Sequence, residues 1–180
     1  MSQKRITLDE LRAIARAAKN KIDHIYLHWT AGNYHQFSDD YHLCIDEDGA
    51  IIATTDDLAE LKEHTWRRNS DAIGVAMCCC AGAVAYSADN IDYGDQPPTV
   101  AQIDSMAQVV AVLCEELGLA INSNIVMTHC EAAELDDYGP STTCERWDLW
   151  SLPDLPGDGQ LKPGGDVVRG KAIWWQHNGL

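Results

Sequence analysis

Two histidines in this sequence follow apolar segments in a way that could bring them together. His28 stands near the end of HIYLHW (residues 24–29), and His129 stands near the end of NIVMTHC (residues 124–130). Both segments are expected to be strands, and if the strands are neighbours the two imidazoles can point into one cleft. Two histidines, a third protein ligand and an open position for water are typical of catalytic zinc. The pair therefore indicates a zinc centre.

The third ligand is expected in a loop near one of the histidines. Cys130 adjoins His129 and would point the other way if the strand continued. Asp148 lies between two tryptophans that could anchor it in a fixed loop. Spacing alone does not decide between Asp148 and Cys144. The full set of candidates downstream of His129 is Cys130, Glu131, Glu134, Asp136, Asp137, Cys144, Glu145 and Asp148.

Capping signals predict two helices beside these strands. Thr7 opens a Thr-x-x-Glu capping box, and apolar residues then recur at helical spacing up to about Lys19. Thr99 opens a Thr-x-x-Gln capping box before a long apolar helical face that ends at Gly118. From His129 to residue 155 the chain is expected to be loop-like and rich in tryptophan.

Two further apolar stretches complete the expected sheet. YHLCIDEDGAIIAT (residues 41–54) predicts a hairpin, with Gly49 supplying the positive φ of its turn. AIGVAMCCCAGAVA (residues 72–85) is dense enough for a central strand that is buried on both faces. We interpret Cys78–Cys80 as part of this buried strand rather than as a metal, redox or reactive-thiol site.

The order of these elements predicts an α/β fold: a single domain with a central mixed β-sheet flanked by helices. No internal repeat or second core is visible in the sequence. LPGDGQLKPGGD is rich in Pro and Gly, so we expect a catalytic domain over residues 1–155, and a linker with a short C-terminal tail over residues 156–180.

Composition excludes several classes of partner. The formal net charge is −15, with 13 Lys and Arg against 28 Asp and Glu, which argues against nucleic acid because phosphate binding needs a basic face. No apolar run approaches the roughly 18 residues of a membrane span, so no stable membrane insertion is expected. The start, MSQKRITLDEL, lacks the apolar segment of a secretory signal and predicts a protein that is cytoplasmic when made. The seven cysteines are then expected to be reduced thiols.

Five stretches of the sequence are similar, in this order, to motifs of one enzyme family. They are IYLHWTAGN, YHLCIDEDGAI, EHTWRRNSDAIGVAM, PTVAQIDSMAQVVAVLCEELGL and VMTHCEA, and together they span roughly residues 21 to 150. On these motifs the chain resembles the zinc-dependent N-acetylmuramoyl-L-alanine amidases of the type-2 amidase and peptidoglycan-recognition-protein superfamily, particularly those of phages and prophages. The resemblance implies the peptidoglycan-recognition-protein-like amidase fold, bound Zn²⁺, and hydrolysis of the amide between N-acetylmuramic acid and L-alanine.

The resemblance also implies a ligand set. His28 and His129 match the family's two histidine ligands of zinc. Its third ligand is an Asp or Cys that follows a basic residue by two positions, and Arg146 with Asp148 supplies this pattern. Cys144 is the alternative third ligand, although Thr142 occupies the position before it where the basic residue is expected. The long separation of His129 from Asp148 implies an inserted loop over about residues 132 to 144.

Catalytic roles carried over from the family fall on Tyr41 and Arg146. Tyr41 matches the family's catalytic tyrosine, and Ala76 stands where other members have a catalytic Glu, so the chain is similar to the tyrosine-using branch. Arg146 stays charged and is suited to stabilising an oxyanion. The Gly32–Asn33 turn is expected to move the backbone aside so that substrate can reach the zinc. Residues expected to bind substrate or line its groove are Thr30, His64, Trp66 and Asn69.

The resemblance implies peptidoglycan, a glycan strand with its stem peptide, as the partner. An endolysin-like role in phage or prophage lysis would require release to the cell wall, for example through a holin-like pore. Two other functions stay open: a non-catalytic peptidoglycan-binding module on the same fold, and a cytoplasmic amidase that recycles soluble muropeptides. The acidic charge is compatible with the second, because it does not favour adhesion to an anionic wall.

Overall fold

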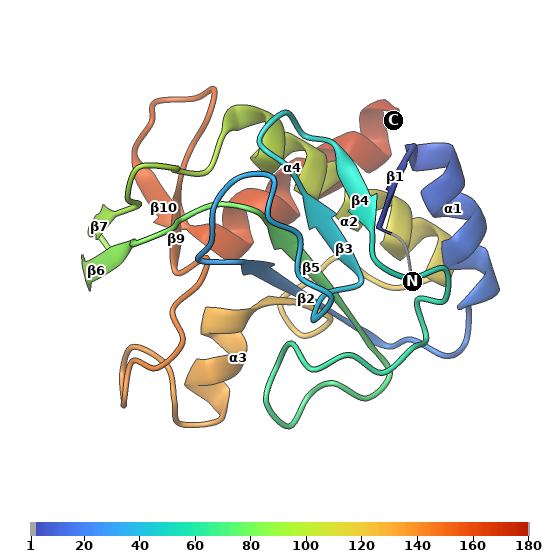
Figure 1. The fold of residues 1–180 in the computed structure, drawn as a ribbon, viewed down its shortest axis with the longest axis horizontal. Helices are drawn as coiled ribbons and strands as arrows, with labels where there is room; N and C mark the ends of the chain where they lie inside the picture. Colours follow the sequence, from blue (N-terminus) through green and yellow to red (C-terminus); the bar gives the residue numbers. More distant parts are fainter. Residues whose placement is uncertain (1–2, 180) are drawn as a thin grey trace.

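A central sheet of six strands organises the computed structural model, which describes residues 3–179 (Figure 1). The strand order is β1-β4-β3-β5-β2-β8. β3, β5, β2 and β8 run parallel to one another, whereas β4 pairs antiparallel with both β3 and β1 at one edge. The predicted mixed sheet in a single α/β domain is therefore confirmed. The strand bounds are β1 Lys4–Ile6, β2 His24–Trp29, β3 Leu43–Ile45, β4 Ile51–Ala53, β5 Ala72–Met77 and β8 Val126–Thr128.

β2 occupies the middle of the parallel part of the sheet. Its Tyr26 is level with Gly74 of β5 on one side and with Met127 of β8 on the other. Because neighbouring parallel strands end at the same edge of a sheet, β2 carries His28 and β8 carries the following His129 to one edge. The two strands are neighbours, which is the condition under which the sequence could bring the two histidines into one cleft. β5 is buried along its whole length, which confirms its central position.

Two helices begin and end where their capping signals predicted. The Thr7 hydroxyl accepts the N–H of Glu10 (3.2 Å) at the start of α1, Leu8–Ala17. The Thr99 hydroxyl accepts the N–H of Gln102 (3.0 Å) at the start of α2, Val100–Leu117. Gly118 then ends α2 in the left-handed conformation, with φ 75°. α2 contacts α1, α4 (Gly164–Asn178) and strands β3 and β5, so these helices form a layer over one face of the sheet.

A short helix follows β8 where we expected only a loop. α3 spans His129–Leu135 and starts with the Thr128 hydroxyl accepting the N–H of Glu131 (3.1 Å), while the Glu131 carboxylate accepts the N–H of Thr128 (2.8 Å). This is the same capping box that marks α1 and α2. The loop prediction was wrong because a helix of two turns carries too little apolar periodicity to be recognised without its cap.

The apolar run of residues 72–85 does not form one strand. β5 ends at Met77, and Cys78–Cys80 are buried but lie beyond it. Cys80 has a left-handed φ of 70° and donates its N–H to the Gln96 carbonyl (2.8 Å), which turns the chain out of the sheet. The interpretation of these thiols as buried is confirmed, but their place in a strand was wrong. The chain continues into an exposed hairpin, β6 Val84–Ser87 and β7 Asn90–Asp92, at the left of Figure 1.

The last part of the chain packs against the layer of helices. β9 Ser151–Pro153 and β10 Leu161–Pro163 pair antiparallel across the expected domain boundary. α4 lies along α2 and buries Val168 and Ala172, and its Arg169 donates to the Glu131 carboxylate (2.7 and 2.8 Å) and the Val126 carbonyl (2.9 Å). α4 is thereby tied to α3 and β8. In the part of the chain that the structure describes, no helix combines the length and apolar character needed to cross a membrane.

Candidate metal centre

His28, His129 and Asp148 meet where β2 and β8 end. Nδ1 of His28 lies 3.1 Å from Nδ1 of His129 and 3.1 Å from Oδ2 of Asp148. Nδ1 of His129 lies 3.3 Å from Oδ1 of Asp148, and all three side chains are buried. Among residues 3–179 this is the one group of at least three His, Cys or carboxylate side chains close enough to hold a metal ion.

The spacing of these donors fits a zinc ion. A tetrahedral site with metal–ligand bonds of about 2.0–2.1 Å has edges of about 3.3–3.4 Å. Here the two histidine nitrogens are 3.1 Å apart, and each lies 3.1 or 3.3 Å from a different oxygen of the Asp148 carboxylate. Two imidazole nitrogens and a carboxylate converge on one point, where their lone pairs would repel without a shared proton or cation. The donor set is also one of those that zinc prefers.

The protein holds His28 and Asp148 in the protonation states that bind metal. Burial lowers the pKa of His28 to about 4, although the hydrogen bond with Asp148 acts in the opposite direction. Burial acts to raise the pKa of Asp148, but the attraction of His129 and His28 outweighs it and holds that pKa well below its usual range. At neutral pH, His28 is neutral and Asp148 is ionised, as metal ligation requires.

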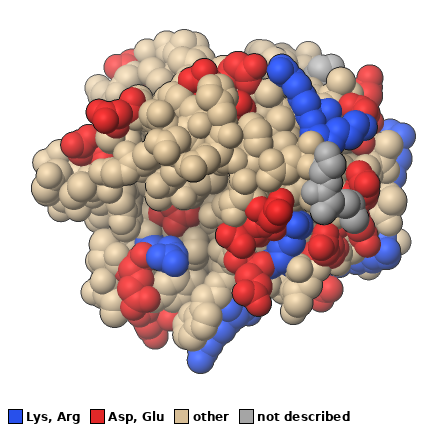
Figure 2. Space-filling model, in the orientation of Figure 1, with Lys and Arg blue, Asp and Glu red and all other residues tan. Residues whose placement is uncertain are grey.

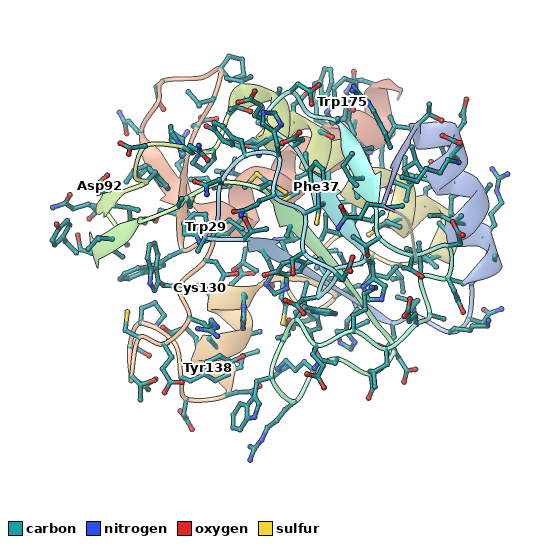
Figure 3. All side chains as sticks on the ribbon, in the orientation of Figure 1. Trp29, Phe37, Asp92, Cys130, Tyr138 and Trp175 are labelled. Carbon is teal, nitrogen blue, oxygen red and sulfur yellow. The ribbon has the colours of Figure 1, made fainter. Side chains whose placement is uncertain are left out.

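Secondary structure and local packing position each member of the group. His28 is the next-to-last residue of β2, and His129 is the first residue of α3 directly after β8. The Cys130 N–H donates to the Asp148 carbonyl (3.3 Å), which ties the Asp148 loop to the first turn of α3. Trp147 packs edge-on against Trp29, with ring centroids 5.3 Å apart, so a tryptophan does anchor this loop. Figure 3 labels Trp29 where β2 ends, and Cys130 and Tyr138 on α3 and just after it.

Cys144 lies outside the group. It is exposed, and its N–H donates to the Gly139 carbonyl (2.8 Å) within the loop that follows α3. The geometry favours Asp148 over Cys144 beside the two histidines. The assignment of Asp148 as a ligand nevertheless remains a prediction about metal binding.

A cleft of about 1100 Å³ opens over the group. Its walls come from the end of β2, from residues 63–69, from residues 136–138 and from residues 145–148. Figure 2 shows acidic side chains across much of this view of the surface and fewer basic ones, in keeping with the net charge of −15. All six residues predicted to act on or bind substrate line the cleft: Thr30, Tyr41, His64, Trp66, Asn69 and Arg146.

Tyr41 and Arg146 lie close to the candidate ligands. The ring of Tyr41 packs 5.0 Å from that of His28, measured between centroids. Burial, and next the negative charge of Asp148, raise the pKa of Tyr41 well above its usual range, so its hydroxyl stays protonated. Arg146 is exposed, and its guanidinium donates to the Glu145 carbonyl (3.0 Å), which leaves most of its donors free.

The wall formed by residues 63–69 is braced from inside. The Asn69 side-chain oxygen accepts the N–H of His64 (3.1 Å) and the N–H of Thr65 (2.7 Å). The His64 ring lies directly over Gly74 of β5, where a Cβ atom would be only 2.6 Å from Cγ of the imidazole. Glycine is therefore required for this close approach. Trp66 projects outward from the same wall, 54% exposed, and packs edge-on against Tyr138.

The turn after His28 differs from the one we expected. Ala31, with φ 50°, takes the left-handed conformation instead of Gly32. The Gly32 N–H donates to the Thr30 hydroxyl (3.2 Å), so a side-chain hydrogen bond holds the turn. The expectation that Gly32 supplies the conformational freedom was wrong.

No pattern in the sequence predicted that two residues, Thr65 and Tyr138, would lie in the cleft. Thr65 places its hydroxyl oxygen 3.3 Å from Nε2 of His28. Tyr138 buries a hydroxyl that has no hydrogen-bond partner among the described residues, and its ring centroid lies 6.0 Å from that of His129. Both residues lie in irregular segments, where no periodicity or spacing rule assigns a direction to a side chain.

Comparison with known proteins identifies the family. A sequence model of the N-acetylmuramoyl-L-alanine amidase family matches residues 18–147. The match includes both histidines of the candidate centre, Tyr41 and Arg146, and it ends one residue before Asp148. No curated protein matches the chain.

Proposed function

The chain belongs to the N-acetylmuramoyl-L-alanine amidase family, and we propose that it is a zinc-dependent enzyme that cleaves the amide between N-acetylmuramic acid and the L-alanine of the stem peptide. The observation that carries the proposal is the buried group of His28, His129 and Asp148 beneath a large cleft. A module that only bound peptidoglycan would have no need for three buried metal-binding side chains whose donor atoms meet at one point.

In this proposal Nδ1 of His28, Nδ1 of His129 and the Asp148 carboxylate hold Zn²⁺. A zinc ion with an open position lowers the pKa of its bound water to about 7 and polarises a carbonyl oxygen. Cys144 would be dispensable, because it lies outside the group.

Arg146 and Tyr41 are proposed to act on the scissile amide. As water adds to the carbonyl carbon, negative charge develops on the oxygen, and the Arg146 guanidinium stabilises it because an arginine keeps its charge at any working pH. Tyr41 donates its hydroxyl proton in a hydrogen bond to the same tetrahedral centre. Since Arg146 cannot readily release a proton, Tyr41 gives its hydroxyl proton to the departing L-alanine amine as it receives the proton that the attacking water releases.

The cleft is proposed to bind the substrate on both sides of the scissile bond. Trp66 offers a partly exposed aromatic face for a sugar ring or an apolar stem-peptide side chain. Thr30 contacts the substrate beside the turn that it stabilises. His64 and Asn69 contribute by fixing the shape of the wall, because Nδ1 of His64 and the side-chain oxygen of Asn69 already serve internal contacts.

The endolysin-like motifs support a role in phage or prophage lysis. In that role the enzyme is made in the cytoplasm and reaches the cell wall after release, for example through a holin-like pore. Recycling of soluble muropeptides is the second candidate, favoured by the net charge of −15, which weakens adhesion to an anionic wall.

Product analysis tests the proposal. The zinc-loaded protein is incubated with intact sacculi and, separately, with soluble muropeptides, and the products are analysed by mass spectrometry. We expect stem peptides with a free L-alanine amine, lost with a chelator and in Asp148→Ala but retained in Cys144→Ala. Cleavage of muropeptides alone would favour recycling, and no cleavage of either substrate by the zinc-loaded protein would refute the amidase.

A further inference from the structure

A single hydroxyl group lies between two imidazoles behind the candidate metal centre. Oγ1 of Thr65 is 3.3 Å from Nε2 of His28 and 2.9 Å from Nδ1 of His64. Thr65 is only 1% exposed, so water does not compete for these contacts. The two rings are nearly perpendicular, at 73°, with centroids 5.4 Å apart.

We propose that Thr65 is a positioning residue that orients the His28 ring and fixes which of its nitrogens carries the proton. The inference rests on the proposed function, because its consequence is stronger binding of metal by Nδ1 of His28. Histidines that bind metals usually donate their second ring N–H to a carboxylate, a carbonyl or water. Here a side-chain hydroxyl takes that place.

Only one arrangement of protons along this chain of groups leaves Nδ1 of His28 free to bind metal. Nδ1 of His28 faces His129 and Asp148, so its lone pair must be free for metal and its proton lies on Nε2. Nε2–H then donates to Oγ1 of Thr65. A threonine hydroxyl has one proton to donate, and the remaining acceptor is Nδ1 of His64. The opposite direction would place a proton on Nδ1 of His28, where it would bond to Oδ2 of Asp148 and block the metal.

The chain of groups ends at His64. Its Nδ1 lies 2.9 Å from Oγ1 of Thr65 and accepts the hydroxyl proton. Nε2 of His64 then carries the proton, and that atom is buried without a hydrogen-bond partner among residues 3–179. Thr65 therefore gives His64 its one side-chain hydrogen bond.

Separate parts of the fold keep the hydroxyl in place. Asn69 accepts the backbone N–H groups of both His64 and Thr65, which fixes the turn that carries them. Gly74 leaves the space that the His64 ring occupies. β2 fixes His28 from the opposite side. A hydroxyl held by three independent constraints can select one ring orientation, whereas a mobile hydroxyl could not.

Zinc affinity, measured by competition with a chromophoric chelator, tests the inference. Thr65→Val keeps the shape of the side chain and removes the hydroxyl, and we expect its zinc affinity to fall about 10- to 100-fold. Thr65→Ser restores the hydroxyl and should remain within about 3-fold of the wild type, by the same reasoning. Thr55→Val is the matched control, because Thr55 is buried and caps the Asp57 N–H (3.1 Å) away from the cleft.

Nitrogen-15 NMR of the histidine side chains shows which nitrogen of His28 carries the proton. A residue that only stabilised the fold would not change this. In the metal-free wild type and in metal-free Thr65→Ser, His28 should carry its proton on Nε2 alone, whereas metal-free Thr65→Val should show a mixture of tautomers. This spectrum of the wild type tests the inference even if Thr65→Val does not fold.

Two results would overturn the inference alone: wild-type zinc affinity in Thr65→Val, or a proton on Nδ1 of His28 in a wild type that binds zinc. A Thr65→Val protein that is less stable but binds zinc normally would reduce Thr65 to a structural residue. Failure of the wild type to bind zinc would overturn the proposed function together with this inference.

Discussion

Gly74→Ala should destabilise the protein, although a glycine inside a strand is normally unfavourable. Gly74 lies in the middle of β5, where replacement by alanine would ordinarily gain about 0.5–1 kcal/mol. The new Cβ would lie 2.6 Å from Cγ and 2.7 Å from Cδ2 of His64. Ordinary carbon contacts are about 3.5–4.0 Å. The imidazole would have to move by about 1 Å, away from its hydrogen bond with Thr65.

The size of the effect follows from two opposing terms. Forcing an extra methyl into a packed interior costs about 1–3 kcal/mol, and the improved strand propensity offsets up to about 1 kcal/mol of this. We expect the free energy of unfolding to fall by about 1–2 kcal/mol, a change of roughly 5- to 30-fold in the unfolding equilibrium. Zinc affinity should fall as well, because the wall that carries Thr65 is displaced.

Urea unfolding of matched variants checks this reasoning. Gly170→Ala makes the same chemical change in α4, where the added Cβ meets no atom within 4 Å and φ is not left-handed. It should stabilise the protein by about 1 kcal/mol through helix propensity. If Gly74→Ala stabilised the protein as Gly170→Ala does, the close approach of His64 to β5 would be refuted.

Two other predictions concern catalysis and pH. Tyr41→Phe should lower kcat about 100- to 1000-fold with little change in KM, because the protonated hydroxyl is proposed to act only at the tetrahedral centre; unchanged kcat in a zinc-loaded variant would remove Tyr41 from the mechanism. His42 is buried, its Nδ1 accepts the Gly74 N–H (3.0 Å), and burial lowers its pKa to about 4. Since the unfolded chain has a histidine pKa near 6.5, it binds more protons than the folded chain between pH 6.5 and 4, so stability is lost as pH falls through this window. The loss of unfolding free energy attributable to His42 is about 3 kcal/mol. An unfolding free energy of the metal-free protein that stayed constant across this window would contradict the prediction.

The sequence predicted the parts of the site that regular elements position. Strand periodicity placed His28 and His129 at strand ends, and their pairing then depended on the two strands being neighbours, which the structure shows. The helices α1 and α2 were recognised from their caps, and α3 could have been, since Thr128 and Glu131 form the same capping box. β1 was not predicted, because three residues acquire strand structure only through pairing with β4.

Contacts between irregular segments and the sheet were beyond sequence reasoning. The hydrogen bonds of Thr65 depend on the loop of residues 63–69, whose path is fixed by Asn69 and by the space above Gly74. Similarly, Cys78–Cys80 looked like a continuation of β5, because a run of buried apolar residues does not reveal where hydrogen bonding to the neighbouring strand stops. Only the left-handed backbone of Cys80 marks the departure from the sheet.

Zinc K-edge X-ray absorption of the zinc-loaded protein tests the central claim most directly. Ligation by His28, His129 and Asp148 predicts a coordination shell of nitrogen and oxygen alone at about 2.0–2.2 Å, with imidazole scattering from two histidines. The spectrum should be unchanged in Cys144→Ala and should lose this shell or its zinc in Asp148→Ala. A sulfur ligand at about 2.3 Å, or scattering from fewer than two imidazoles, would contradict the assigned centre.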